Sequence, residues 1–216
     1  MDVYKTDDEQ VEQIKTWLKE NGASLATGVL IGLAVLFGGK AWVEYRERQS
    51  EQASNIYTQL TAALATENKD AAVAAESAIT GDFSSSPYAV LGQLAMARQK
   101  IDSGEPDTAR AHLRWAMEHA SMPQLAHIAR LRLARLLLAQ DQLDELRPLL
   151  RVADEGPFAP AYDEIRGDLY LKDGDGAAAV AAYDKALAGL AADAPTRGFI
   201  ELKRDNVPQK TPDSSE

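Results

Sequence analysis

The side chains that could carry out chemistry in this chain are few. The three histidines, His112, His119 and His127, are not spaced to put two metal ligands one helical turn apart, and the chain has no cysteine. These facts argue against a metal centre and exclude cysteine nucleophiles and thiolate zinc sites. Surface histidines are the more ordinary interpretation. We therefore expect no metal ligands.

The carboxylates Asp163, Glu164 and Asp168 could lie close together on one helix, but nothing in the sequence marks two of them as a tuned acid and base. The run from Ser84 to Ser86 precedes Pro87 and has the composition of a loop, and the chain has neither a phosphate-binding glycine loop nor a nucleophile elbow. We expect no catalytic residues and no cofactor, which leaves interaction surfaces as the source of function.

Charge narrows the class of partner. The formal net charge is −10 over 216 residues, which argues against nucleic acid or anionic lipid as the main partner, because both attract a basic surface. Between residues 98 and 151 there are nine basic and seven acidic side chains, whereas residues 152–216 have seven and thirteen. The arginines of the middle segment fit a solvated helix surface, with a binding patch as the alternative.

The run Asn21–Gly39 contains no ionisable side chain. As a helix it would span roughly 27–29 Å, which matches the hydrocarbon core of a bilayer. Trp17 lies before the run, and Trp42 and Tyr45 follow it, at the depth where aromatic rings favour the membrane interface. The sequence predicts a single transmembrane helix over residues 21–43, through which the chain contacts the lipid bilayer.

Two other interpretations of this run fit less well. A buried core helix would normally carry a polar stripe, and a signal peptide would begin with a basic segment, whereas the first twenty residues contain six acids and three lysines. Lysines and arginines balance on the two sides of the run, so the charges do not orient the helix across the membrane.

Beyond the run the pattern is helical, with turn residues at intervals that suit two-helix units. A set of small and apolar positions recurs at offsets of 37 and 33 residues, close to the period of tetratricopeptide repeats. The recurring triplets are Ala109, Leu113 and Ala116, then Leu146, Leu150 and Ala153, then Ala179, Tyr183 and Ala186, with Ala97, Ala134 and Gly167 as the small residues of the first helices. We expect an all-α tetratricopeptide-like solenoid over residues 44–206, with an ordinary helical bundle as the alternative.

The ends of this domain are expected to differ from its middle. Residues 56–65, together with Ala71, Ala75 and Ala78, could form a further unit. Residues 195–205 predict a closing helix that covers the last unit with Phe199, Ile200 and Leu202. Residues 207–216 are polar and are expected to be disordered, and residues 1–20 form a separate segment before the membrane helix.

Two surfaces are candidates for binding partners. Ser24, Gly28, Gly32 and Gly39 share one face of the predicted membrane helix, which would let another helix pack closely, although glycine is also common in membrane helices without such a role. The first helices of stacked units form a concave face that binds peptides in many repeat proteins. The candidate residues on that face are Gln93, Lys100, Arg130, Leu137, Asp163 and Tyr170.

The acidic start Val3–Gln10, the lead-in Val11–Gly22, the glycine-rich hydrophobic run, Trp42 and the repeat-like helices together resemble the YfgM family, the ancillary SecYEG translocon subunits of Gram-negative bacteria. The resemblance covers nearly the whole chain, and its most specific part is the lead-in with the hydrophobic run. No catalytic residues follow from it, because the family is not enzymatic.

The resemblance implies a protein of the inner membrane that crosses once, with residues 1–20 in the cytoplasm and the repeat domain in the periplasm. It implies an adaptor that associates with the SecYEG translocon and the chaperone PpiD and assists nascent or unfolded envelope proteins. A negative link to the Rcs stress response and its response regulator is also implied. A tetratricopeptide scaffold that organises a different envelope complex would use the same architecture and remains the alternative.

Overall fold

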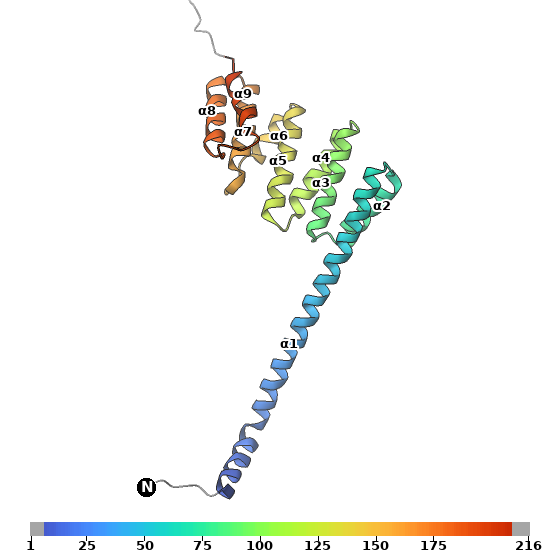
Figure 1. Ribbon diagram of the computed structural model, residues 1–216, viewed down its shortest axis with the longest axis vertical. Coiled ribbons are helices and arrows are strands. Elements are labelled where there is room, and N and C mark those ends of the chain that lie inside the picture. The colour runs from blue at the N-terminus through green and yellow to red at the C-terminus, as the bar shows by residue number, and fades with distance from the viewer. Residues whose placement is uncertain (1–6, 209–216) are drawn as a thin grey trace, which may run out of the picture. The chain divides into compact units, whose positions relative to one another are not determined.

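A computed structural model of the chain describes residues 7–208 (Figure 1). Every regular element among these residues is a helix, so the predicted all-α fold is confirmed. The chain divides into one compact unit that ends at Gln52 and a second that begins at Ala53. The elements are α1 (Asp7–Ala65), α2 (Lys69–Asp82), α3 (Pro87–Asp102), α4 (Pro106–His119), α5 (Pro123–Ala139), α6 (Leu143–Leu149), the 3₁₀ turn η1 (Gly156–Phe158), α7 (Ala159–Lys172), α8 (Gly176–Ala188) and α9 (Arg197–Asp205).

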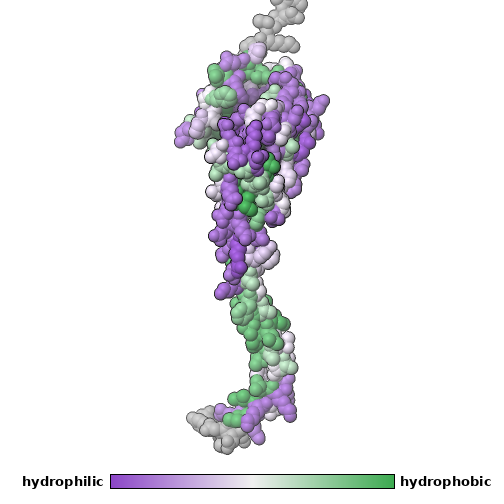
Figure 2. Space-filling model, turned by 90° about the vertical axis from the view of Figure 1, so that its right-hand side faces the viewer, coloured by the Kyte–Doolittle hydropathy of each residue, from purple (hydrophilic) through white to green (hydrophobic). Residues whose placement is uncertain are grey.

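The first unit contains the part of α1 that carries the uncharged run. Its bulky apolar side chains are exposed, and the most apolar stretch has no buried residue. Figure 2 shows this stretch as a hydrophobic band with hydrophilic surface on both sides. Thr27 donates its hydroxyl to the Ala23 carbonyl at 2.8 Å, which satisfies the side chain within the helix. By length and composition this is the one helix, among the described residues, that could span a membrane.

The second unit is built from helical hairpins whose turns are alike. A residue with a left-handed backbone lies two positions after the end of the first helix of each hairpin, at Glu67, Gly104, Asp141 and Gly174. In each turn the next amide donates to a carbonyl five residues back, at 2.8–2.9 Å. This is the hydrogen bond of a Schellman C-cap, which satisfies a carbonyl that the helix end would leave unpaired. The spacing of 37, 37 and 33 residues between these turns repeats the period predicted from the apolar positions.

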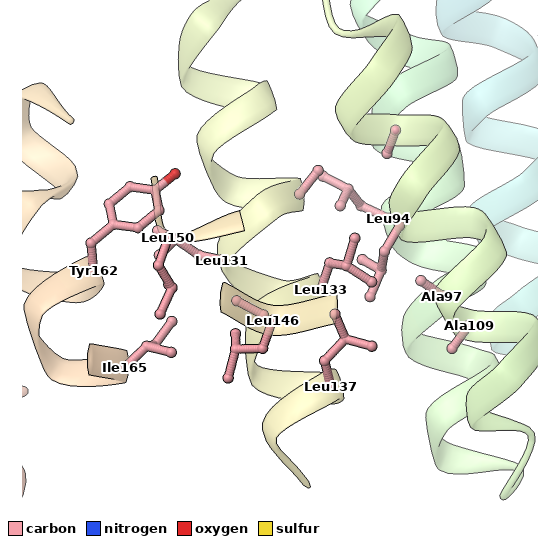
Figure 3. Packing of buried hydrophobic residues seen from close by; sticks show 14 of the residues in the cluster. Leu94, Ala97, Ala109, Leu131, Leu133, Leu137, Leu146, Leu150, Tyr162 and Ile165 are labelled. Atoms are coloured by element: carbon pink, nitrogen blue, oxygen red, sulfur yellow. The ribbon is translucent and has the colours of Figure 1, made fainter. Parts of the chain in front are cut away.

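The main core is formed by residues of the consecutive helices from α3 to α7. It includes Leu133, Leu137, Leu146, Tyr162 and Ile165, all of which are almost completely buried (Figure 3). Smaller clusters hold the two ends: one joins the end of α1 to α2 and α3, and the other joins α8 to α9. Each hairpin therefore buries its apolar face against the next, as a solenoid requires.

Glycine permits the closest approach of two helices in the last hairpin. A Cβ atom built on Gly167 of α7 would lie 2.4 Å from the Tyr183 ring of α8. Both the ring and the predicted small positions Ala97 and Ala134 are buried. The sequence predicted that all three positions lie where the two helices of a unit approach closely. This prediction is confirmed for Gly167, and the burial of Ala97 and Ala134 agrees with it.

The structure corrects the sequence expectation in the hairpin of α5 and α6. The second helix ends at Leu149, and Ala153, which was expected on its buried face, is exposed in the loop that follows. Pro148 lies in the last turn of α6 and cannot donate a backbone hydrogen bond, which favours an end to the helix there. Arg166 then fixes the loop by donating to the Leu150 carbonyl at 2.7 Å.

The further unit expected before the main repeats is present, but the buried face of α2 differs from the predicted one. Ala72, Ala75 and Ile79 are buried, whereas Ala71 is exposed and Ala78 is half-buried, so Ala75 was placed correctly and Ala71 was not. Asn68 caps α2 by accepting a hydrogen bond from the Ala71 amide, so the helix begins at Lys69, and its buried side then follows Ala72, Ala75 and Ile79 at helical spacing.

The closing helix is also confirmed as α9, but fewer of its apolar side chains pack against the last unit than expected. Ile200 is buried against α8, whereas Phe199 and Leu202 are 58% and 59% exposed, so these two side chains do not cover the last unit. Val207, which was assigned to the disordered tail, is buried in the same cluster. The rest of that tail, residues 209–216, lies outside the described residues.

Candidate partner-binding site

An open groove of about 590 Å³ lies across α5, α7 and α9. These are the first helices of two consecutive hairpins and the closing helix, so the groove follows the face that repeat proteins commonly use for ligands. Its lining residues are Arg135, Leu138, Ala139, Glu164, Asp168, Leu171, Lys172, Phe199 and Lys203.

Lys203 joins α9 to α7 inside this groove. Its Nζ donates to Glu164 Oε1 and to Asp168 Oδ2, both at 2.7 Å. Arg135 donates to the other oxygen of Glu164 at 3.1 Å, and the Tyr183 hydroxyl donates to the other oxygen of Asp168 at 2.6 Å. Each of the four carboxylate oxygens therefore has a donor from the protein itself.

These contacts set the protonation of the groove. Burial alone would raise the pKa of Glu164, but the hydrogen bond and charge of Lys203, together with Arg135, outweigh it and lower the pKa below its usual value. Burial, and then the hydrogen bond to Asp168, raise the pKa of Tyr183 well above its usual value. Glu164 is thus an anion and Tyr183 a neutral donor at neutral pH, which makes a structural ion-pair network rather than an acid and base pair.

The rest of the groove combines apolar surface with half-exposed cations. Leu138, Leu171 and Phe199 supply the apolar part, and the Lys203 ammonium lies 4.8 Å from the centre of the Phe199 ring. The side chains of Arg135 and Lys172 are 47% and 46% exposed. Such a surface can contact the side chains of a peptide and offer hydrogen-bond donors to it.

Three of the six residues predicted for the concave face are buried. Leu137 lies in the main core, and Gln93 lies between Glu76 and His112 at 2.8 and 2.7 Å. Asp163 is held by Arg166 and Lys185 at 2.8 and 3.1 Å. Their burial corrects the expectation that these side chains offer an accessible surface, because each serves packing or polar contacts within the domain.

The other three, Lys100, Arg130 and Tyr170, are at least partly exposed but do not line the groove. Lys100 pairs with Glu105 at 2.9 Å. Arg130 lies beside Tyr162, and its Nε is buried without a hydrogen-bond partner. Nothing in the arrangement of these three joins them to one binding surface.

The groove residues were missed by a small error in the helical phase. Leu138, Glu164 and Leu171 each directly follow a residue that was predicted, namely Leu137, Asp163 and Tyr170. One residue along a helix turns the side chain by about 100°, which moves it from a neighbouring face of the helix onto the groove lining. The recurrence of leucine at positions 138 and 171, at the repeat offset of 33, was a signal that could have identified this face.

Two of the three histidines, His112 and His127, and several arginines make contacts between helices. His112 Nδ1 contacts Gln93 Oε1, and its hydrogen bond to Glu76 lowers the pKa of that carboxyl despite partial burial. His127 lies 2.9 Å from the Tyr162 hydroxyl, so the interpretation of surface histidines was wrong for both. Arg114 pairs with Glu145 of the next hairpin at 2.9 Å, in agreement with a helix-surface role for the basic segment.

The candidate face of the membrane helix is uncovered. A Cβ atom on Gly28, Gly32 or Gly39 would meet no other atom within 4 Å, and Ser24 is exposed. The helix therefore presents small residues at positions 24, 28 and 32, to which a second helix could come close, whereas the exposed Val35 lies on the same face before Gly39.

Hairpins with a repeat of 33–37 residues define a class, the tetratricopeptide-like repeat proteins, here with a candidate membrane helix before the repeats. The comparison with known families agrees, because a tetratricopeptide repeat-like domain matches residues 15–209. No solved structure matches the chain.

Curated relatives identify the family within this class. The protein called ancillary SecYEG translocon subunit in Escherichia coli (strain K12) is 30% identical over 185 residues, which cover 85% of this chain and 88% of that protein. Proteins of the same name from Haemophilus influenzae and Neisseria gonorrhoeae are 26% and 22% identical, over 85% and 96% of this chain and 90% and 100% of their own length. The chain belongs to the family of ancillary SecYEG translocon subunits, the YfgM family.

Proposed function

We propose that this protein is a membrane-anchored adaptor of the SecYEG translocon. The observation that carries the proposal is that the family match over residues 15–209 includes both the uncharged helix and the groove of the repeat domain. Relatives that share this whole arrangement are named as ancillary subunits of that translocon. The absence of a paired acid and base in the groove fits an adaptor, since its ionisable groups hold helices together.

In this proposal the two surfaces have different tasks. The face of Ser24, Gly28, Gly32 and Gly39 packs against a helix of the channel, because close packing is what drives association between helices in lipid. The groove across α5, α7 and α9 holds a polypeptide near the channel exit. The occupant is the chaperone PpiD or a nascent or unfolded envelope protein.

The proposal places residues 1–20 in the cytoplasm and the repeat domain in the periplasm, on the basis of the family resemblance. The chain has no cysteine, so its fold does not depend on the redox state of either compartment. A negative effect on the Rcs stress response would follow indirectly, if loss of the adaptor leaves unfolded envelope proteins that activate that response.

A photocrosslinking amino acid at Gly28, introduced into the protein in bacterial membranes, is expected to give adducts with a channel subunit. The matched control is Leu30, which lies about 200° around the same helix and is exposed. We expect adducts from position 28 to exceed those from position 30 by about fivefold or more, because only the small face permits close approach. Equal adducts at both positions, or none with the channel at position 28, would contradict this docking surface.

A further inference from the structure

The carboxylates of the groove already have partners within the protein. Glu164 and Asp168 are its two carboxylates, and each of their oxygens accepts from Lys203, Arg135 or Tyr183. Their side chains are also only 11% and 19% exposed. A basic side chain that entered the groove would therefore meet two carboxylates that are little exposed and already paired with Lys203 or Arg135, so it would gain little from either.

The hydrogen-bond donors of the groove, in contrast, remain partly free to bind further acceptors. Arg135 uses one nitrogen for Glu164, and nearly half of its side chain remains in solvent. Lys172 is equally exposed, and it pairs with Asp141, which lies outside the groove lining. A guanidinium has five donor hydrogens and an ammonium three, so both groups can bind further acceptors.

Apolar surface lies between these cations and Lys203. Phe199 is more than half exposed although it is a large aromatic side chain, and Leu138 and Leu171 extend the same surface on α5 and α7. Covering these side chains removes apolar area from water, and this is a favourable contribution that depends little on the exact sequence of the ligand.

We propose that the groove selects polypeptide segments that combine bulky apolar side chains with acidic ones. The apolar side chains cover Leu138, Leu171 and Phe199, and a carboxylate accepts from Arg135 or Lys172. This inference rests on the proposed function and adds the chemistry of the segment that the adaptor holds.

The preference runs against the charge of the whole protein. A net charge of −10 attracts basic peptides at long range, whereas the groove favours acidic ones at contact, because its carboxylates are paired and little exposed and its cations are half-exposed. Tighter binding of acidic peptides would therefore indicate binding in the groove, and tighter binding of basic peptides would indicate binding on the general surface.

The test uses the full-length protein in nanodiscs of neutral phosphatidylcholine and two fluorescein-labelled peptides. One peptide alternates leucine with glutamate, and the other replaces every glutamate with lysine. Fluorescence anisotropy at about 0.15 M salt, where distant charges are screened, is expected to show roughly five- to tenfold tighter binding of the glutamate peptide. Binding to empty nanodiscs is measured for subtraction.

The substitution Arg135→Gln is expected to reduce this preference to about twofold or less, because it removes a donor while Lys203 still holds Glu164. The matched control is Arg114→Gln, since Arg114 is 50% exposed, forms a similar pair with Glu145 and lies outside the groove. It should keep the full preference. Circular dichroism on both variants checks that they remain folded.

Tighter binding of the lysine peptide, no binding of either peptide, or equal loss of preference in the two variants would overturn the inference. If both peptides bound equally and Phe199→Ser abolished their binding, the proposed preference would also be overturned, but the groove would remain a binding site. Channel adducts from position 28 do not depend on the charge of the groove, so the proposed function is tested separately.

Discussion

The substitution Gly167→Ala is expected to lower the free energy of unfolding of the repeat domain by about 2–3 kcal/mol. The added methyl group would lie 2.4 Å from a carbon of the Tyr183 ring. The ring is completely buried and cannot turn aside without moving its hydroxyl from Asp168, to which it donates at 2.6 Å. The clash thus outweighs the gain of about 1 kcal/mol that alanine brings to a helix.

Urea unfolding of the full-length protein in mild detergent, followed by circular dichroism, measures this effect. The control is Gly198→Ala in α9, where an added Cβ would meet no atom within 4 Å. That variant should be as stable as the natural protein or slightly more stable. If Gly167→Ala behaved like Gly198→Ala, the close contact between α7 and α8 would be wrong.

The substitution Lys203→Met is expected to lower the free energy of unfolding by about 2–3 kcal/mol and to loosen α9. It leaves Glu164 and Asp168 partly buried and without their shared cation, although Arg135 and Tyr183 still reach one oxygen of each. The effect is smaller than for a fully buried pair, because all three side chains retain some contact with water.

The loss of stability in the Lys203→Met variant should depend on pH. The pKa of Glu164 is lower in the folded protein than in the unfolded chain. The stability that its contacts contribute is therefore complete above the unfolded pKa and is lost as the pH falls through the folded value. The difference between the natural protein and the Lys203→Met variant should thus shrink on acidification below about pH 4.

The matched control is Lys185→Met. Lys185 also contacts a buried carboxylate, Asp163, but it is 69% exposed and Arg166 holds the same oxygen. We expect a change of less than about 0.5 kcal/mol. A similar loss in both variants, or a loss in Lys203→Met that does not depend on pH, would show that Lys203 acts by packing alone. Limited proteolysis near Arg197 provides a second readout of the release of α9.

The sequence was sufficient for the arrangement of helices because its signals are local. A run without charges needs only its length to indicate a membrane helix, and recurring alanines such as Ala109 and Ala179 mark the buried faces of the second helices. Turn chemistry at Gly104 and Gly174 then fixes the hairpins. The turn at Asp141 has the same left-handed backbone without a glycine, and Gln140-Asp141 was still recognisable as turn chemistry.

The groove could not be located in the same way. Whether Leu137 or Leu138 is buried depends on how α5 turns against α6, and both residues are leucine. The pairing of Lys203 with Glu164 joins positions 39 residues apart, and no local pattern records it. The short second helix α6, with Pro148 in its last turn, also moved Ala153 out of the alignment.

The most direct test of the adaptor role is photocrosslinking from the groove in living cells. A photoreactive amino acid in place of Phe199 is expected to give adducts with periplasmic polypeptides, either PpiD or a secreted precursor. The control in place of Val73 on α2, which is similarly exposed at 55%, should give few. Equal adducts from both positions, none from position 199, or adducts with cytoplasmic proteins alone would contradict a periplasmic adaptor that binds its partners in this groove.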